Sequence, residues 1–185
     1  INRGEVAKIF GELFYCVDPG YRGEKGWIKT QYANLETDGN IFDKVLQKKE
    51  KDFGHFFIPE NVYIIGTMND IDRSVESMDF AFRRRFTWAE VKAEDTQYML
   101  DAELDAVLAD EAKRRMENLN SAISGIEGLG TAYHIGASYF LKLDNYDGDF
   151  EQLWDYHLKG ILREYLRGNP EKDELMKQLE KAYQE

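Results

Sequence analysis

Apolar residues in the first half of the chain follow two different patterns. Between residues 6 and 17 they recur at steps of three and four, which predicts an amphipathic helix. The run from Val62 to Gly66 is instead continuously apolar, which is typical of a central strand in a parallel sheet covered on both faces. We predict an α/β unit over residues 1–91 that also contains a β-hairpin ending near Leu35, a surface excursion with a helical turn over 41–54, a helix over 74–84 and a strand over 86–91.

After Val91 the spacing of apolar residues becomes helical throughout. It predicts a helix over 97–123, then a glycine-rich turn and an apolar patch at 139–141. Residues 150–166 give the cleanest amphipathic pattern in the chain, and the Gly-Asn-Pro at 168–170 ends it. A last charged helix runs to the C-terminus. We therefore predict an all-helical unit over residues 92–185.

Composition narrows the functional classes. A net charge of −11 argues against this segment as a main nucleic-acid contact, since phosphate binding needs a basic surface. The single cysteine, Cys16, cannot form an internal disulfide, which is typical of a reducing cytoplasm. No apolar run approaches the roughly 18–20 residues of a membrane helix. Because the chain opens at Ile1 rather than Met, we expect a fragment of a longer protein.

Asn69 is the first candidate for chemistry. It follows the apolar run, and open α/β sheets bind ligands at the carboxyl ends of their strands. An asparagine there can orient a water molecule or a terminal phosphate. The alternative is purely structural: Met68-Asn69-Asp70 would be a strand-to-helix turn, with Asp72 or Ser74 capping the helix.

Three consecutive arginines, Arg83 to Arg85, are the second candidate. Guanidinium groups neutralise charge that develops on phosphoryl oxygens. The structural alternative is that cations at a helix C-terminus complement its dipole, for about 0.3–1 kcal/mol each. Two arginines would serve that purpose, so the third favours a functional role.

These segments together resemble McrB-type AAA+ NTPases, the nucleotide-hydrolysing subunits of modification-dependent restriction systems. The match runs from Val62-Tyr-Ile-Ile-Gly-Thr-Met-Asn-Asp-Ile-Asp-Arg-Ser74 to Asp79-Phe-Ala-Phe-Arg-Arg-Arg-Phe86. The family carries Thr-Ala where this chain has Asp70 and Ile71. Because this turn is associated with guanine preference in the family, the resemblance leaves both GTP and ATP open as the substrate. The resemblance implies an α/β fold: the second half of an AAA+ P-loop-type core, lacking the P-loop and the Walker B acidic pair, followed by an all-helical lid.

The resemblance also implies roles for individual residues. Asn69 would lie between the terminal phosphate and the attacking water. Asp72 would lie at the nucleotide site, and Arg73 would make contacts within or between subunits. Arg84 and Arg85 would be the arginine finger and its neighbour, reaching the adjacent subunit's nucleotide. No metal ligand is implied within this segment.

The N-terminus resembles the family segment that follows the Walker B pair, which places Asn2 beside the nucleotide. The P-loop and the Mg²⁺-binding Asp would then lie upstream. No Gly-x-x-x-x-Gly-Lys-[Ser/Thr] occurs in the chain, and residues 23–30 are a false near-match because Ile28 replaces the second glycine. Residues 133–141 resemble a lid segment near sensor 2, but Ala137 replaces a polar residue, so we assign that segment no nucleotide contacts. His157 is expected to be a packed, satisfied residue of its helix.

For the intact protein the resemblance implies a cytoplasmic, homo-oligomeric ring, which we expect to be hexameric. The ring would hydrolyse GTP or ATP with Mg²⁺ and drive an McrC-type endonuclease subunit. DNA would be bound by a separate domain and no membrane would be involved. The fragment alone is expected to bind no cofactor and to be inactive. Two alternatives stay open: an AAA+ ATPase remodelling motor outside restriction, and a non-catalytic assembly module.

Overall fold

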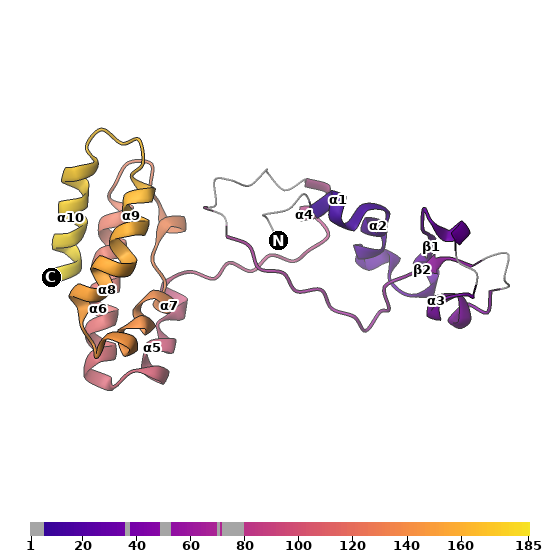
Figure 1. The fold of residues 1–185 in the computed structure, drawn as a ribbon, viewed down its shortest axis with the longest axis horizontal. Coiled ribbons are helices and arrows are strands. Elements are labelled where there is room, and N and C mark those ends of the chain that lie inside the picture. The colour runs from indigo at the N-terminus through magenta and orange to yellow at the C-terminus, as the bar shows by residue number, and fades with distance from the viewer. Residues whose placement is uncertain (1–5, 36–37, 49–52, 70, 72–79) are drawn as a thin grey trace. The chain divides into compact units, whose positions relative to one another are not determined.

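The computed structural model describes residues 6–35, 38–48, 53–69, 71 and 80–185 (Figure 1). The chain forms two compact units, residues 1–88 and 89–185. The sequence pattern predicts this boundary a few residues later, between residues 91 and 92. None of the described helices is both long enough and apolar enough to span a membrane.

The N-terminal unit consists of short helical segments and a small sheet. The predicted amphipathic helix is present but interrupted at Gly11, whose φ of +49° separates α1 (Val6–Phe10) from α2 (Phe14–Val17) through the turn η1 (Gly11–Leu13). Strands β1 (Ile28–Lys29) and β2 (His55–Phe56) pair antiparallel. The other elements are η2 (Pro19–Tyr21), η3 (Glu24–Gly26), η4 (Ala33–Leu35), α3 (Ile41–Val45) and α4 (Phe80–Arg83).

Several sequence predictions for this unit are wrong. No β-hairpin closes within residues 20–35, because β1 pairs with β2 across the excursion instead. Residues 62–66 and 86–91 are not strands, and Tyr63 and Ile65 are 86% and 92% exposed. A buried parallel strand needs hydrogen-bonding neighbours on both edges and cover on both faces, and the described part of this unit supplies neither. The predicted helical turn in the excursion is confirmed by α3.

Aromatic rings hold α4 against the first helices. Phe82 is 2% exposed, and its ring lies 5.6 Å from Phe14, 6.0 Å from Phe10 and 4.8 Å from Phe86. Aromatic pairs at such distances contribute about 0.5–1.5 kcal/mol beyond their buried area. This cluster therefore fixes the position of the arginines that follow Phe82. Of the helix predicted over 74–84, only α4 lies within the described residues.

A buried carboxylate, that of Asp43 in α3, forms hydrogen bonds with residues on either side of the excursion. Asp43 is fully buried; its Oδ1 accepts the N–H of His55 at 2.9 Å and lies 2.6 Å from the ring Nδ1 of His55. Its Oδ2 accepts the N–H groups of Gly54 (2.9 Å) and Asn40 (3.1 Å). Burial by itself raises the pKa of a carboxyl group, but these hydrogen bonds outweigh it and lower the pKa of Asp43 to about 2. The excursion is therefore tied to β2 by a charged centre.

Asp43→Asn should destabilise this region by about 1–3 kcal/mol, because the new amide sets its own N–H groups against buried backbone donors. In the wild type the pKa of Asp43 is lower in the folded chain than in the unfolded one. Its stabilising contribution is therefore complete above about pH 4 and is lost as pH falls through about 2. Amide exchange of Gly54 and His55, followed by NMR, measures both effects. Asp38→Asn, at an exposed position, is the matched control; equal exchange in the two variants would contradict the prediction.

The second unit is built from helices, as the sequence predicts. The helix predicted over 97–123 is broken at Leu104, and Asp105 caps the second part by accepting the N–H groups of Val107 and Leu108. The run over 150–165 is helical throughout and contains a π-helical turn. The elements are η6 (Glu94–Thr96), α5 (Tyr98–Glu103), α6 (Ala106–Ser124), η7 (Thr131–Tyr133), α7 (Ala137–Phe140), η8 (Leu141–Tyr146), α8 (Phe150–Leu153), η9 (Trp154–Leu158), α9 (Lys159–Tyr165) and α10 (Lys172–Gln184).

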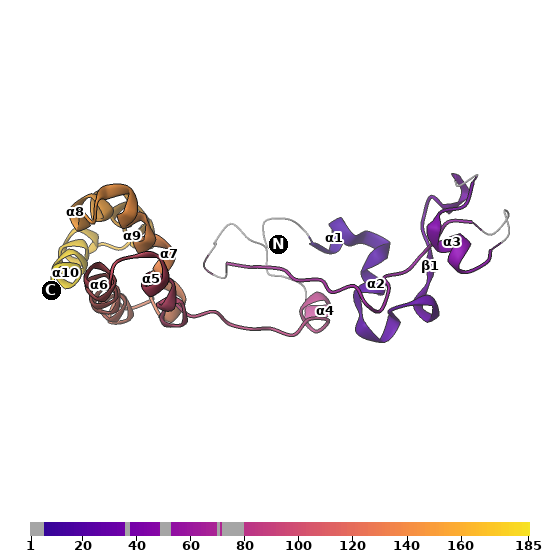
Figure 2. The same cartoon turned by 90° about the horizontal axis from the view of Figure 1, so that it is seen from below.

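One apolar core holds these helices together. Figure 2 views them nearly end-on, and α10 lies beside α6. Tyr183 of α10 anchors the bundle: it stacks on Trp154 at 5.1 Å, and its hydroxyl donates to the carbonyl of Phe150 at 2.9 Å. Burial accordingly raises the pKa of Tyr183 well above its ordinary value. The buried centre includes Leu119, Ile123, Phe140, Leu153, Leu158 and Leu162.

Candidate functional site

Asn69 lies on the surface at the polar end of the apolar run. Residues 62–69 form no regular secondary structure, and the side chain of Asn69 is exposed. Its Oδ1 accepts the N–H of Ile71 at 3.3 Å, which is the hydrogen bond of an Asx turn. The carboxamide is thus oriented by the backbone that follows it, without the strand that was predicted to carry it. Asn2, Asp72 and Arg73 lie outside the described residues, so their nucleotide contacts stay predictions.

The three arginines after Phe82 are directed to different surroundings. Successive residues of a helical turn point about 100° apart, so they cannot share one role. Arg83 folds back on its own unit: its guanidinium carbon lies 5.3 Å from the ring centroid of Trp88, and the indole N–H of Trp88 donates to its carbonyl at 2.9 Å. Arg83 is therefore engaged at the end of α4.

Arg85 is packed into the N-terminal unit. Its side chain is 12% exposed, and its guanidinium carbon lies 4.2 Å from the ring centroid of Phe14. Its Nε lies 3.8 Å from a carboxylate oxygen of Asp18, and its Nη1 donates to the carbonyl of Ala81. Through these contacts Arg85 links the end of α4 to α2. Its predicted catalytic role stays a prediction that would require these contacts to be released.

Arg84 is exposed to solvent. Its backbone N–H donates to the carbonyl of Phe80 at 3.1 Å, which keeps it in the turn that ends α4. Its side chain has no hydrogen bond, ion pair or ring contact with any residue in the described ranges. Of the arginine run, Arg84 is therefore the residue whose guanidinium is available to a second molecule.

In the helical unit, the backbone of residues 134–137 is held by side chains of η6 and α6. The side chain of Asn120 in α6 donates to the carbonyl of Ile135 at 3.0 Å and accepts its N–H at 2.7 Å. Thr96 accepts the N–H of Ala137 at 3.1 Å and donates to the carbonyl of Ala93 at 2.6 Å. The segment that resembles the sensor 2 region is thus fixed by polar clamps on its backbone.

Sequence reasoning missed these clamps, although a signal for one of them existed. Asn120 is a buried polar residue within the apolar stripe of α6, between Leu119 and Ile123. A polar side chain on a buried helix face needs a hydrogen-bond partner, so its position could have indicated a backbone clamp. Thr96 carried no such signal, because it lies in an irregular polar stretch.

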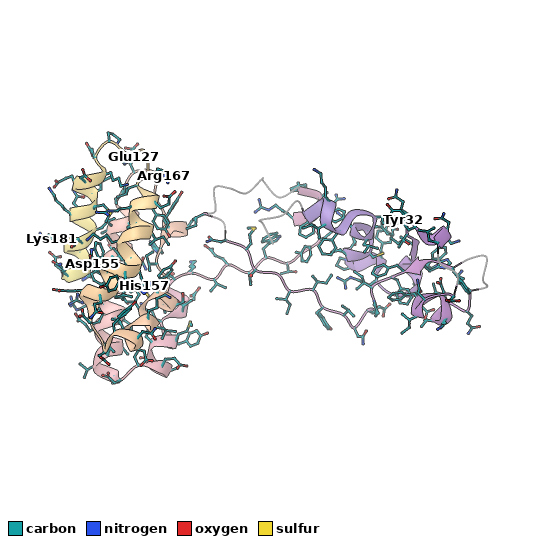
Figure 3. All side chains as sticks on the ribbon, in the orientation of Figure 1. Tyr32, Glu127, Asp155, His157, Arg167 and Lys181 are labelled. Atoms are coloured by element: carbon teal, nitrogen blue, oxygen red, sulfur yellow. The ribbon has the colours of Figure 1, made fainter. Side chains whose placement is uncertain are left out.

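The three histidines occupy separate environments. His55 contacts Asp43, and the ring Nε2 of His134 lies 2.7 Å from the hydroxyl of Ser124. His157, labelled in Figure 3, lies 2.9 Å from the hydroxyl of Tyr146, which confirms that it is a packed and satisfied residue. Within the described ranges, no three His, Cys, Asp or Glu residues are grouped so that they could hold a metal ion.

Comparison with known proteins decides the family. Residues 111–174, from α6 into α10, match the family described as "McrB, alpha-helical lid domain". The type IV methyl-directed restriction enzyme EcoKMcrB subunit of Escherichia coli K12 is 33% identical over 146 residues, which cover 76% of this chain. The chain is McrB-type. A component of the type II restriction enzyme BsuMI, YdiS of Bacillus subtilis 168, is 28% identical over 105 residues, or 55% of this chain.

The two relatives are much longer than the matched region. The McrB-type chain spans 28% of the length of each. The family match identifies the helical unit as a lid domain, as the sequence predicted. The structure does not contain the parallel sheet expected of the preceding half within its described residues.

Proposed function

We propose that this chain is part of an AAA+ nucleoside triphosphatase that hydrolyses GTP or ATP with Mg²⁺ and drives a partner endonuclease in modification-dependent DNA restriction. Residues 1–91 would belong to the second half of its nucleotide-binding α/β core. Residues 92–185 would form its lid.

The similarity to the EcoKMcrB subunit carries this proposal. It covers 76% of the chain, whereas the lid unit accounts for only about half of it, so the similarity must include part of the N-terminal unit. That unit contains the Asn69 turn and the arginine run. Relatedness across both units supports a shared arrangement of core and lid rather than a lid borrowed by an unrelated protein.

Each candidate residue has a role in this proposal. Asn69 orients the attacking water against the terminal phosphate, and Asp72, Arg73 and Asn2 lie near the nucleotide. Arg84 reaches the nucleotide of the adjacent subunit in a hexameric ring. Its exposed, uncommitted guanidinium supports this assignment. Arg85 supports the position of Arg84 through its contacts with Phe14 and Asp18.

The proposed partners are an McrC-type endonuclease subunit and DNA, the latter bound through a separate domain. The charge of −11 supports that separation, because an acidic surface repels phosphate. The test is made on the intact protein with its partner endonuclease. Nucleotide hydrolysis that is needed for cleavage of modified DNA would support the proposal. Cleavage that proceeds without hydrolysis would overturn it.

We expect this chain alone to bind nucleotide more weakly than about 1 mM. The phosphates of a nucleotide are held mainly by the backbone N–H groups and the lysine of a P-loop, and the chain contains no such motif. Calorimetry with Mg·GTP and with Mg·ATP measures this, and the intact protein serves as the positive control. Micromolar affinity of the chain for either nucleotide would mean that the phosphate site lies within these 185 residues.

A further inference from the structure

The negative charge of the chain is concentrated in the lid unit. Residues 89–185 contain 11 Lys and Arg against 21 Asp and Glu, a formal charge of −10, whereas residues 1–88 contain 13 against 14. Within the lid, two stretches hold carboxylates but no Lys, Arg or His. They are residues 93–112, with seven carboxylates, and residues 143–156, with five.

A groove of about 410 Å³ lies where these two stretches meet. Helix α5 contacts both α6 and η8, and α5 and the start of α6 lie at the same end of the lid in Figure 1. Half-buried Met99, Leu104 and Leu141 give the groove an apolar floor, while Glu103 and Asp144 are exposed at its rim. Its volume falls within the range of about 300–1,000 Å³ that is typical of ligand pockets.

The rim carboxylates of this groove carry uncompensated charge. Glu103 and Asp144 form no ion pair within residues 80–185, all of which the structure describes. Nearby acidic groups differ: Asp101 is paired with Lys113, and Asp105 caps α6. Lys142 of η8 does not line the groove. Two free carboxylates therefore flank an apolar floor.

A large aromatic side chain extends this surface into solvent: Tyr98, which lines the groove, is 70% exposed. Exposed tyrosine beside a half-buried apolar floor is the composition of an interface centre, and a charged rim sets its partner preference. A single cation would leave the apolar floor uncovered. A nucleic acid, or the equally acidic lid of a second copy, would be repelled.

We propose that this end of the lid, defined by Tyr98, Glu103, Leu104, Leu141 and Asp144, docks an amphipathic helical segment of a partner protein. That segment presents apolar anchors to the groove and Lys or Arg to its rim. Recognition of this kind lays an apolar helix face into a groove and uses flanking charge for orientation and association rate. The proposal does not depend on nucleotide chemistry, so it can fail or hold separately from the proposed function.

The test uses the 185-residue chain and three labelled helix-forming peptides of about 15 residues. One carries Leu at helical spacing among Lys, the second has Ser in place of Leu, and the third has Glu in place of Lys. Fluorescence anisotropy should show binding of the first peptide, at least about tenfold weaker binding of the second, and no binding of the third. A DNA duplex should not compete.

Charge reversal at the rim locates the binding surface. Glu103→Lys combined with Asp144→Lys should weaken the first peptide by about tenfold or more, and raising the salt concentration should act in the same direction. Glu127→Lys is the matched control, because Glu127 is exposed at the opposite end of the lid (Figure 3). Circular dichroism checks that each variant is folded. Equal affinity for the Leu and Ser peptides, or equal loss in the rim and control variants, would overturn the proposal.

Discussion

Arg84→Ala in the intact protein should lower kcat by about 10³-fold or more, while nucleotide affinity changes by no more than a few fold. A guanidinium supplied in trans stabilises charge that develops on the phosphoryl oxygens mainly in the transition state. Arg84 fits this role because its side chain is exposed and uncommitted within the described part of the chain. Steady-state hydrolysis and equilibrium nucleotide binding measure the two quantities.

Mixed rings separate Arg84 from Asn69, whose replacement by alanine should also lower kcat. An Arg84→Ala subunit keeps its own phosphate-binding residues, so its site should regain turnover beside a neighbour that supplies the arginine. An Asn69→Ala site should stay slow beside any neighbour, because Asn69 acts within its own subunit. Subunits that carry both changes are not needed, since each change has a distinct pattern of rescue.

Arg83→Ala is the matched control in the same turn. Arg83 already stacks on Trp88, so its loss should affect hydrolysis far less than the loss of Arg84. Hydrolysis at the wild-type rate by Arg84→Ala, or mixed rings without rescue, would exclude a trans-acting finger at this position. The arginine run would then serve to complement the dipole of α4 and to brace it through Arg85.

Asn120→Leu should destabilise the lid by about 2–6 kcal/mol. The substitution removes both hydrogen bonds to Ile135 and leaves a buried N–H and a buried carbonyl without partners, at about 1–3 kcal/mol each. Because 1.4 kcal/mol is tenfold in an equilibrium constant, amide exchange in α6 should accelerate by at least about tenfold. Urea unfolding measures the change in the free energy of unfolding, and hydrogen exchange of lid peptides measures the change in exchange rate.

Asn118→Leu supplies the control for this effect. Asn118 lies in the same helix at a half-buried position and has no side-chain hydrogen bond to the described residues. Its replacement should change the free energy of unfolding by less than about 0.5 kcal/mol. Comparable losses in the two variants would contradict the prediction, because a destabilisation of that size would then not require loss of the clamp on Ile135.

The lid could be predicted from the sequence because its information is local. Steps of three and four along residues 150–166 place apolar side chains on one face of a helix wherever that helix packs. The Gly-Asn-Pro after Arg167 ends the helix for reasons of backbone geometry alone. The motif around Asn69 and the arginine run likewise identified the McrB type, which comparison confirmed.

The N-terminal unit could not be predicted in the same way. The run from Val62 to Gly66 has the composition of a central strand, but strand pairing is set by neighbours distant in sequence, and the described residues contain none for it. The pairing of β1 with β2 depends on Asp43, whose four hydrogen-bond contacts draw the ends of the excursion together. No local pattern in the sequence indicated that partnership.

By itself, the sequence determined the helical character of the lid, the family of the chain and the residues that are candidates for chemistry. The tertiary structure alone distinguished the three arginines, because Phe14, Asp18 and Trp88 engage two of them and leave Arg84 exposed. It also brought Glu103 and Asp144, which are far apart in the chain, to the rim of one groove. The periodicity of apolar side chains depends only on residues close together in the sequence. The burial of a side chain, the pairing of strands and the direction of a guanidinium depend on contacts between residues far apart in the sequence.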